Sequence, residues 1–274
     1  DYDDTYIGWD EESHDWLPRM VLDDFLCDSD RPVTAFRWWG SLLGWCENTI
    51  PHNELPDAFY ITIWDNVPAG ADATYSHPGQ MIWHNYCLSY DVSFYGWEYD
   101  PRYGYVDLAK FEFYQELEPE DYWYQPNDVN VYWLGITAIY SDMTHEPNYP
   151  WGWETRPHFF EDDAVRFFGW PEPNTTYPPS MFEPIELFEE TWDLSFELIS
   201  NPRLPLKPLI RHSKWSQPPI EIDPTSRIPQ YSGWDEPSYF PAPSEPVDNE
   251  ALVNKSDTIA DIRKQAMSAP VTVP

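Results

Sequence analysis

The sequence has little of the positive charge that nucleic-acid-binding proteins need. Only 15 Lys and Arg residues oppose 48 Asp and Glu residues, which gives a formal net charge of −33. Phosphate binding requires a basic surface, so this balance excludes nucleic acid as a partner and disfavours an anionic membrane surface. The chain also has no apolar run of about 18 residues, and we therefore expect no membrane span.

Motifs that carry catalysis or zinc binding are also missing. The seven histidines form no HExxH motif, and the 11 glycines form no GxSxG elbow or phosphate-binding loop. Glu112 and Glu197 lie in strand-like runs and are the candidate carboxylate pair for glycoside hydrolysis, but outward-facing strand charge explains them more simply. We therefore predict that the domain is not an enzyme.

Three cysteines are too few and too widely spaced for a zinc ribbon or an attached haem. Cys46 and Cys87 are the candidate disulfide pair in an oxidising compartment, which leaves Cys27 as a thiol. The alternative is three buried thiols.

Aromatic residues and prolines are abundant, with 16 Trp, 19 Tyr, 14 Phe and 30 Pro. Aromatic residues favour strands, and proline at this density excludes long helices. Runs of strand type are separated by turn signals such as His77-Pro-Gly79. They cover residues 33–39, 59–64, 81–86, 103–114, 129–140, 164–168 and 192–199. The pattern predicts an all-β fold, a jelly-roll-like antiparallel β-sandwich with long loops.

The composition divides the chain into three parts. Residues 1–200 carry the strand pattern and are expected to form the β-sandwich domain. Residues 201–250 are rich in proline and are expected to form an extended C-terminal arm. Residues 251–274 are expected to form a short helical or flexible tail, with Ser256 as the N-cap of a helix over 256–267.

One motif near the start of the chain occurs again near its end. Tyr6-Ile-Gly-Trp-Asp-Glu-Glu-Ser13 returns as Tyr231-Ser-Gly-Trp-Asp-Glu-Pro-Ser238. A whole domain fits between the two copies, which is typical of one unit in a repeat array. We therefore expect head-to-tail assembly with copies of itself or related repeat units, through the Pro-rich arm, into a filament or surface layer.

Two further stretches carry a resemblance to a known kind of domain. Residues 21–27 (VLDDFLC) and 32–41 (PVTAFRWWGS) resemble a signature of tandem-repeat domains of unknown function in large exported proteins of planctomycete-type bacteria. Further similar pieces lie at residues 64–70, 75–79, 131–140, 151–156, 162–164 and 214–219. The resemblance spans about residues 6–240. It implies export, a β-sandwich and modular repetition, and it supplies no catalytic residues.

Acidic clusters are the candidate metal site. Hard cations such as Ca²⁺ bind several oxygen ligands, and neighbouring carboxylates on loops supply them. The candidate ligands are Asp23, Asp24, Asp28, Asp30, Asp162 and Asp163. Calcium is thus the one cofactor that the sequence suggests, although a solvated acidic surface explains the same residues. Because the strand pattern places Phe25 in the core, one of Asp23 and Asp24 must point inward, where a carboxylate needs donors or a metal.

Tryptophans in segments that lack a clear strand pattern indicate a binding or assembly surface. The candidates are Trp9, Trp151, Trp153, Trp215 and Trp234. Exposed aromatic rings stack on sugars or insert into a partner, so binding of a polysaccharide is the alternative to assembly. The chain starts at DYDDTYIGWDEE, which we interpret as a processed start or an excised fragment of a secreted, extracellular or cell-surface protein.

Overall fold

The structure is a computed structural model that describes residues 5–16, 19–27, 31–125, 130–141, 145–187, 190–200 and 210–212. The predicted tail helix, most of the Pro-rich arm, and Asp28, Asp30, Trp215 and Trp234 lie outside the described residues. Within the described part, no helix has the length and apolar character needed to cross a membrane.

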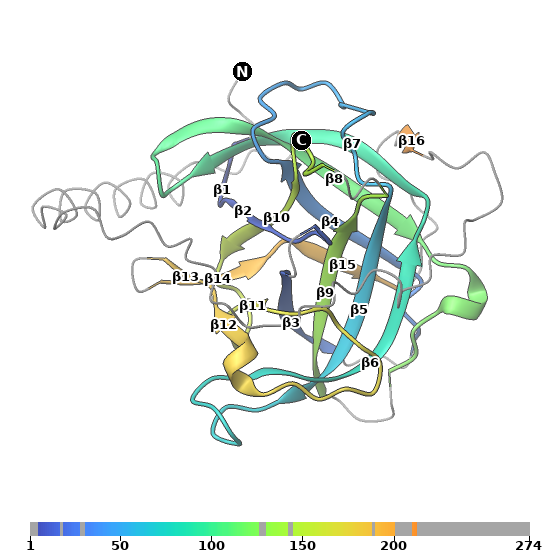
Figure 1. Cartoon of the computed structure of the whole chain (residues 1–274), viewed down its shortest axis with the longest axis vertical. Coiled ribbons are helices and arrows are strands. Elements are labelled where there is room, and N and C mark those ends of the chain that lie inside the picture. The colour runs from blue at the N-terminus through green and yellow to red at the C-terminus, as the bar shows by residue number, and fades with distance from the viewer. Residues whose placement is uncertain are drawn as a thin grey trace, which may run out of the picture. The chain divides into compact units, whose positions relative to one another are not determined.

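The described chain folds into two β-sheets packed as a sandwich, which confirms the predicted all-β class (Figure 1). The larger sheet contains β1 (Thr5–Ile7), β2 (Asp10–Glu12), β4 (Ala35–Leu42), β7 (Tyr90–Asp100), β8 (Tyr105–Glu116), β10 (Trp151–Pro157), β13 (Glu186–Leu187), β14 (Glu190–Leu194), β15 (Phe196–Ile199) and β16 (Ile210–His212). The smaller sheet contains β3 (Met20–Cys27), β5 (Ala58–Val67), β6 (His77–Cys87), β9 (Asn130–Ile139), β11 (Val165–Phe167) and β12 (Phe182–Pro184). Two 3₁₀ turns, η1 (Pro119–Asp121) and η2 (Pro179–Met181), complete the described elements.

The strand order is that of a jelly roll. The central strands of the larger sheet pair in the order β2-β10-β4-β8, and those of the smaller sheet in the order β3-β9-β5-β6. All of these pairs are antiparallel, and the chain crosses repeatedly from one sheet to the other. Two interleaved four-stranded sheets of this kind define the jelly roll. Strand β7 is an addition that pairs with the outer edge of β8.

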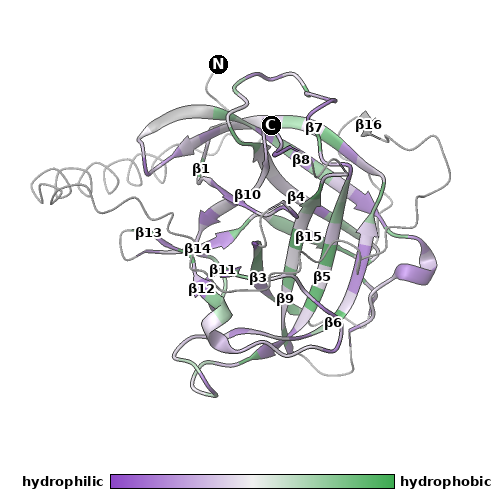
Figure 2. Cartoon of the chain, in the orientation of Figure 1, coloured by the Kyte–Doolittle hydropathy of each residue, from purple (hydrophilic) through white to green (hydrophobic). Residues whose placement is uncertain are grey.

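Alternating aromatic and aliphatic residues fill the space between the sheets. On β4, Phe36 and Trp38 point inward and are at most 1% exposed. The Trp38 ring stacks on Phe113 of β8, with centroids 5.8 Å apart, and meets Phe59 of β5 edge-on. Aromatic pairs of this geometry stabilise a core beyond the area they bury. Figure 2 shows hydrophobic residues along β5 and β9, which pair with each other in the smaller sheet.

The N-terminal segment closes a ring of strands around the opposite face of the larger sheet. Strand β1 pairs in parallel with β7, and β2, only two residues further on, pairs antiparallel with β10. Strands β7, β8, β4, β10 and β2 pair in this order, and β2 is joined by the chain to β1, which pairs with β7 and so completes the ring (Figure 1). Residues that point away from the aromatic core, such as Lys110 and Glu154, face the interior of this ring and are buried there.

Several local expectations are wrong. His77-Pro-Gly79 is not a turn, because it forms the start of β6 and pairs with the end of β5. The predicted strand 192–199 is divided at Ser195 into β14, which pairs with β10, and β15, which pairs with β4. The alternation of apolar Trp192 and Leu194 with Asp193 predicts an outward-facing Asp193, but this residue is buried.

The expected disulfide is also wrong. All three cysteines lie among the described residues, and the structure joins none of them in a disulfide. Cys87 is buried and its thiol donates to the Gln115 side chain at 2.8 Å, whereas Cys46 is exposed. Burial raises the pKa of the Cys87 thiol, which keeps it protonated and unreactive.

Candidate functional site

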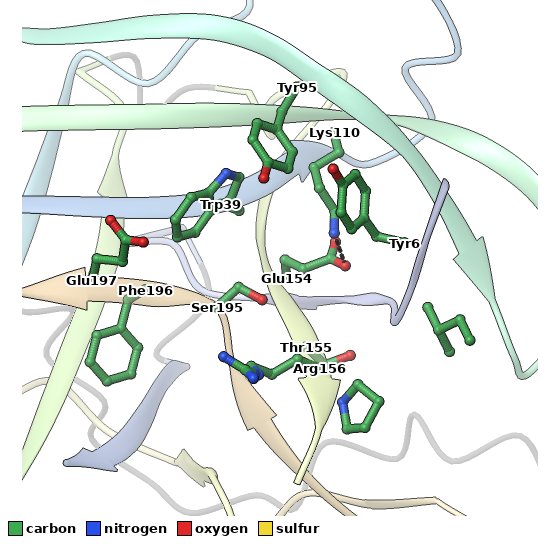
Figure 3. A pocket seen from close by; sticks show the side chains of 12 residues that line it. Tyr6, Trp39, Tyr95, Lys110, Glu154, Thr155, Arg156, Ser195, Phe196 and Glu197 are labelled. Atoms are coloured by element: carbon green, nitrogen blue, oxygen red, sulfur yellow. Dashed lines mark hydrogen bonds and ion pairs between the residues drawn. The ribbon is translucent and has the colours of Figure 1, made fainter. Parts of the chain in front are cut away.

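A cavity of about 490 Å³ opens where strands β4 and β10 separate. The two strands pair only at Gly40–Leu42 and Trp151–Trp153, and β15 replaces β10 as the neighbour of β4 beyond that point. The cavity is lined by Tyr6, Ile7, Trp39, Tyr95, Lys110, Glu154, Thr155, Arg156, Pro157, Ser195, Phe196 and Glu197. These residues come from β1, β4, β7, β8, β10 and β15, and from Ser195 between β14 and β15 (Figure 3). The ring closed by the N-terminal segment therefore forms most of the site.

One wall of the cavity is aromatic. The rings of Tyr6 and Tyr95 lie 5.1 Å apart at 34°, and Trp39 meets Tyr95 at 5.6 Å and 63°. Figure 3 shows the three rings gathered on one side of the cavity. All three residues are half-buried, so the rings keep accessible surface for a ligand.

The opposite wall carries hydrogen-bonding groups. Figure 3 shows Thr155, Arg156 and Ser195 across the cavity from the aromatic rings. The Arg156 guanidinium lies 4.7 Å from the ring centroid of Phe159, and no ion pair to it occurs among the described residues. It remains available as a donor to a ligand oxygen.

An ion pair lies between the two walls. Lys110 Nζ contacts Glu154 Oε1, and both side chains are at most 5% exposed. Lys110 Nζ also lies 4.6 Å from the Tyr6 ring centroid, a cation–π geometry. Burial raises the pKa of Glu154 to about 8, with Lys110 opposing the shift and Asp10 adding to it.

A cluster of three buried carboxyl groups adjoins this ion pair. Asp10, Glu98 and Glu154 each have an oxygen atom within 4.8 Å of the others, and within the described ranges no other His, Cys, Asp or Glu set is as tight. Asp10 accepts hydrogen bonds from the Ser41 hydroxyl and from Ser41 N, the latter at 3.1 Å. Burial, followed by the Asp10 charge, raises the pKa of Glu98 far above its ordinary value.

The aspartates predicted as metal ligands lie elsewhere, where β3, β14 and the 158–163 loop meet. Asp23 and Asp24 are both buried, at 2% and 3% exposure. Asp23 Oδ2 accepts a hydrogen bond from Leu194 N at 2.7 Å, and Asp24 Oδ2 accepts one from Asp162 N at 3.3 Å. Backbone N–H groups thus donate to both oxygen atoms of Asp23 and to one of Asp24, whereas Asp24 Oδ1 is buried without a donor among the described residues.

Two further acidic residues complete this second cluster. Asp163 lies 3.8 Å from His158 Nδ1, and the same nitrogen lies 3.0 Å from Asp193 Oδ1. Burial, followed by the Asp193 charge, raises the pKa of Asp23 well above its ordinary value. The structure brings four of the six predicted ligands to one region, and calcium there stays a prediction.

The expected exposure of the candidate tryptophans is wrong for the three that the structure describes. Trp9, Trp151 and Trp153 are at most 1% exposed. Trp9 meets Trp192 edge-on at 4.5 Å, and its indole N–H donates to Glu11. Side chains packed in this way cannot stack on a ligand or insert into a partner while the domain is folded.

Part of the cavity was not predicted, because strands β7 and β10, which supply Tyr95, Glu154 and Arg156, were not predicted. Residues 151–157 were interpreted as a loop, yet they form β10 and carry Glu154 and Arg156 into the site. The period-2 pattern Trp151, Trp153, Thr155 against Gly152, Glu154, Arg156 is the signal that identifies this strand. No local pattern brings Glu98 and Asp10 together, because their contact depends on closure of the ring.

The fold and the cavity define the chain as a jelly-roll β-sandwich domain with a pocket on its larger sheet. Within that class, the chain belongs to the family described as Domain of unknown function (DUF7901), whose match covers residues 1–199. The comparison with curated proteins and the comparison with solved structures each found no match.

Proposed function

We propose that this domain binds a carbohydrate in the cavity between β4, β10 and β15. The observation that carries the proposal is the opposition of an aromatic wall and a polar wall across one pocket. A sugar ring has an apolar face that stacks on aromatic side chains and hydroxyl groups that need hydrogen-bond partners. The three rings of Tyr6, Trp39 and Tyr95 suit the first requirement, and Arg156 with Ser195 suits the second.

The size of the cavity supports a small ligand or one short part of a chain. Pockets for small organic molecules span about 300–1,000 Å³, and this one measures about 490 Å³. The polar groups include both signs of charge, because Lys110 and Arg156 line the cavity together with Glu154 and Glu197. Such a set can donate to and accept from the same hydroxyl-rich ligand.

The described part of the Pro-rich arm favours binding over assembly. Strand β16 pairs antiparallel with β7 of its own domain, at Tyr90, Asp91 and Val92. With β1 on the same edge of β7, two short strands cover an edge that another chain would otherwise extend. Export and head-to-tail assembly stay predictions, and both are compatible with a carbohydrate-binding unit.

The test is a polysaccharide panel with the purified chain and two variants. Trp39→Ala removes the ring that contacts Tyr95 at the cavity wall and is expected to weaken binding about tenfold or more. Tyr124→Ala is the matched control, because Tyr124 is 63% exposed and does not line the cavity. Binding to no polysaccharide, or an equal loss in both variants, contradicts the proposal.

The same samples separate binding from hydrolysis. Glycoside hydrolysis needs two carboxyl groups facing each other across the bond that breaks. The sequence candidates Glu112 and Glu197 both face Arg37 instead, at 3.9 Å and 2.7 Å. We expect no reducing ends to be released from a bound polysaccharide, and their steady release would make the domain an enzyme.

A further inference from the structure

We propose that Asp10, Glu98 and Glu154 form a binding site for one hard divalent cation, with calcium the best fit, at the base of the cavity. This site is separate from the aspartates of β3 that the sequence suggested, and it does not depend on carbohydrate binding. Its three carboxyl groups come from β2, β7 and β10, which meet only because the N-terminal segment closes the ring.

The carboxyl oxygens of Glu98 are buried without a hydrogen-bond donor from the described backbone or hydroxyl groups. Glu98 is 0% exposed, and within the described residues no N–H or hydroxyl group donates to its carboxyl oxygens, whose hydrogen-bonding contact is with the carboxyl group of Asp10. Glu154 Oε2 is buried in the same way and has no donor, whereas Glu154 Oε1 is held by Lys110. Buried carboxylate oxygens without donors are costly, and a cation in their midst satisfies them.

The charge of the cluster matches a divalent ion. Three carboxylates and Lys110 carry a net charge of −2, and the neighbouring Asp100 is already neutralised by Arg102 at 2.6 Å. All the ligands are oxygen atoms, which suits calcium, magnesium or manganese rather than zinc. Oxygens bound to calcium at about 2.3–2.6 Å lie up to about 5 Å apart, and those of the cluster lie within 4.8 Å of one another.

Glu154 connects the cluster with the cavity. Its side chain lines the pocket beside Lys110 (Figure 3), and its carboxyl group is also one of the three in the cluster. A carboxyl group binds a cation in its deprotonated form, so the ion competes with protons for these oxygen atoms and releases any that the cluster holds.

The test is calorimetric titration of the full chain, first treated with a chelator, with calcium, magnesium, manganese and zinc chlorides in turn. We expect one calcium ion per chain, weaker or no binding of zinc, and proton release seen as a heat that depends on the ionisation enthalpy of the buffer. If the wild-type chain binds none of the four ions, the cluster stores protons only and the proposal is overturned.

Two isosteric variants then locate the ion. Glu98→Gln keeps the shape of the side chain and is expected to weaken calcium binding by at least about tenfold. Glu112→Gln makes the same change at a buried carboxyl group of β8 that faces Arg37 and is expected to leave calcium affinity unchanged. Near-ultraviolet circular dichroism checks that both variants are folded. Calcium binding that survives in Glu98→Gln, or that Glu112→Gln abolishes, overturns the assignment.

Discussion

At the scale of single residues, two groups of buried carboxyls differ in how their oxygen atoms are satisfied. Asp23 and Asp193 receive hydrogen bonds from backbone N–H groups, which hold loops and strands together. Glu98 receives none among the described residues. An acid-rich composition alone does not distinguish a structural carboxylate from a ligand, because the difference lies in the donors that the fold brings to each oxygen.

Asp24 gives a pH dependence that can be measured. Burial, followed by the charge of Asp162, raises its pKa to about 8 in the folded protein, against an ordinary value of 3.8. The folded state therefore holds the proton more tightly than the unfolded chain does. This contribution to stability is complete below about pH 4 and disappears as the pH rises through about 8.

We expect Asp24→Asn to unfold at the wild-type temperature at about pH 5 and at a higher temperature at about pH 9. The gain follows because the amide avoids a buried charge, and each kcal/mol corresponds to about 2–4 °C in a domain of this size. Thermal unfolding in the presence of a chelator measures it. A variant that is less stable than wild type at both pH values would show that Asp24 is needed as an ionised acceptor.

At the scale of elements, the segment from Tyr6 to Ser13 organises the site. It supplies Tyr6 to the aromatic wall and Asp10 to the carboxyl cluster, and it joins β7 to β10. Gly8 lies at its bend, and a Cβ atom there would overlap the carbonyl oxygen of Thr155. Only a residue without a side chain allows this close approach.

Gly8→Ala is therefore expected to displace the segment from β10. The cost of such an overlap is about 1–3 kcal/mol of unfolding free energy, and ligand affinity in the cavity should fall with it. Denaturant unfolding and the binding titrations described above measure the two effects together. An unchanged midpoint with unchanged affinity would show that β1 and β2 do not shape the site.

At the scale of the whole molecule, the net charge of −33 sets the solution behaviour. Excess charge of one sign repels itself more strongly in the compact state. We expect the unfolding temperature to rise as sodium chloride increases from about 0.01 M to about 0.15 M, because the Debye length falls from about 30 Å to about 8 Å. Potassium chloride should act equally, and a difference between the two salts would indicate specific ion binding instead of screening.

The structure assigns a role to each of four residues in the first copy of the repeated motif. The residues that occur again as Tyr231, Gly233, Trp234 and Asp235 correspond to Tyr6, Gly8, Trp9 and Asp10. Those four positions supply a cavity wall, the bend, a core ring and a carboxyl ligand candidate. The second copy thus contains the same residue types that close the ring of strands in this domain. A repeat unit that follows the second copy stays a prediction from the sequence.

The sequence by itself determined the all-β class, because period-2 aromatic patterns such as Phe59-Tyr-Ile-Thr-Ile-Trp64 are local and the strand geometry follows from them. It also indicated that Asp23 or Asp24 points inward, and the structure buries both. Only the tertiary structure decided which tryptophan side chains are buried and which carboxyl groups lie close together. Asp10, Glu98 and Glu154 are far apart in the chain, and their proximity arises from strand pairings whose partners no local pattern specifies.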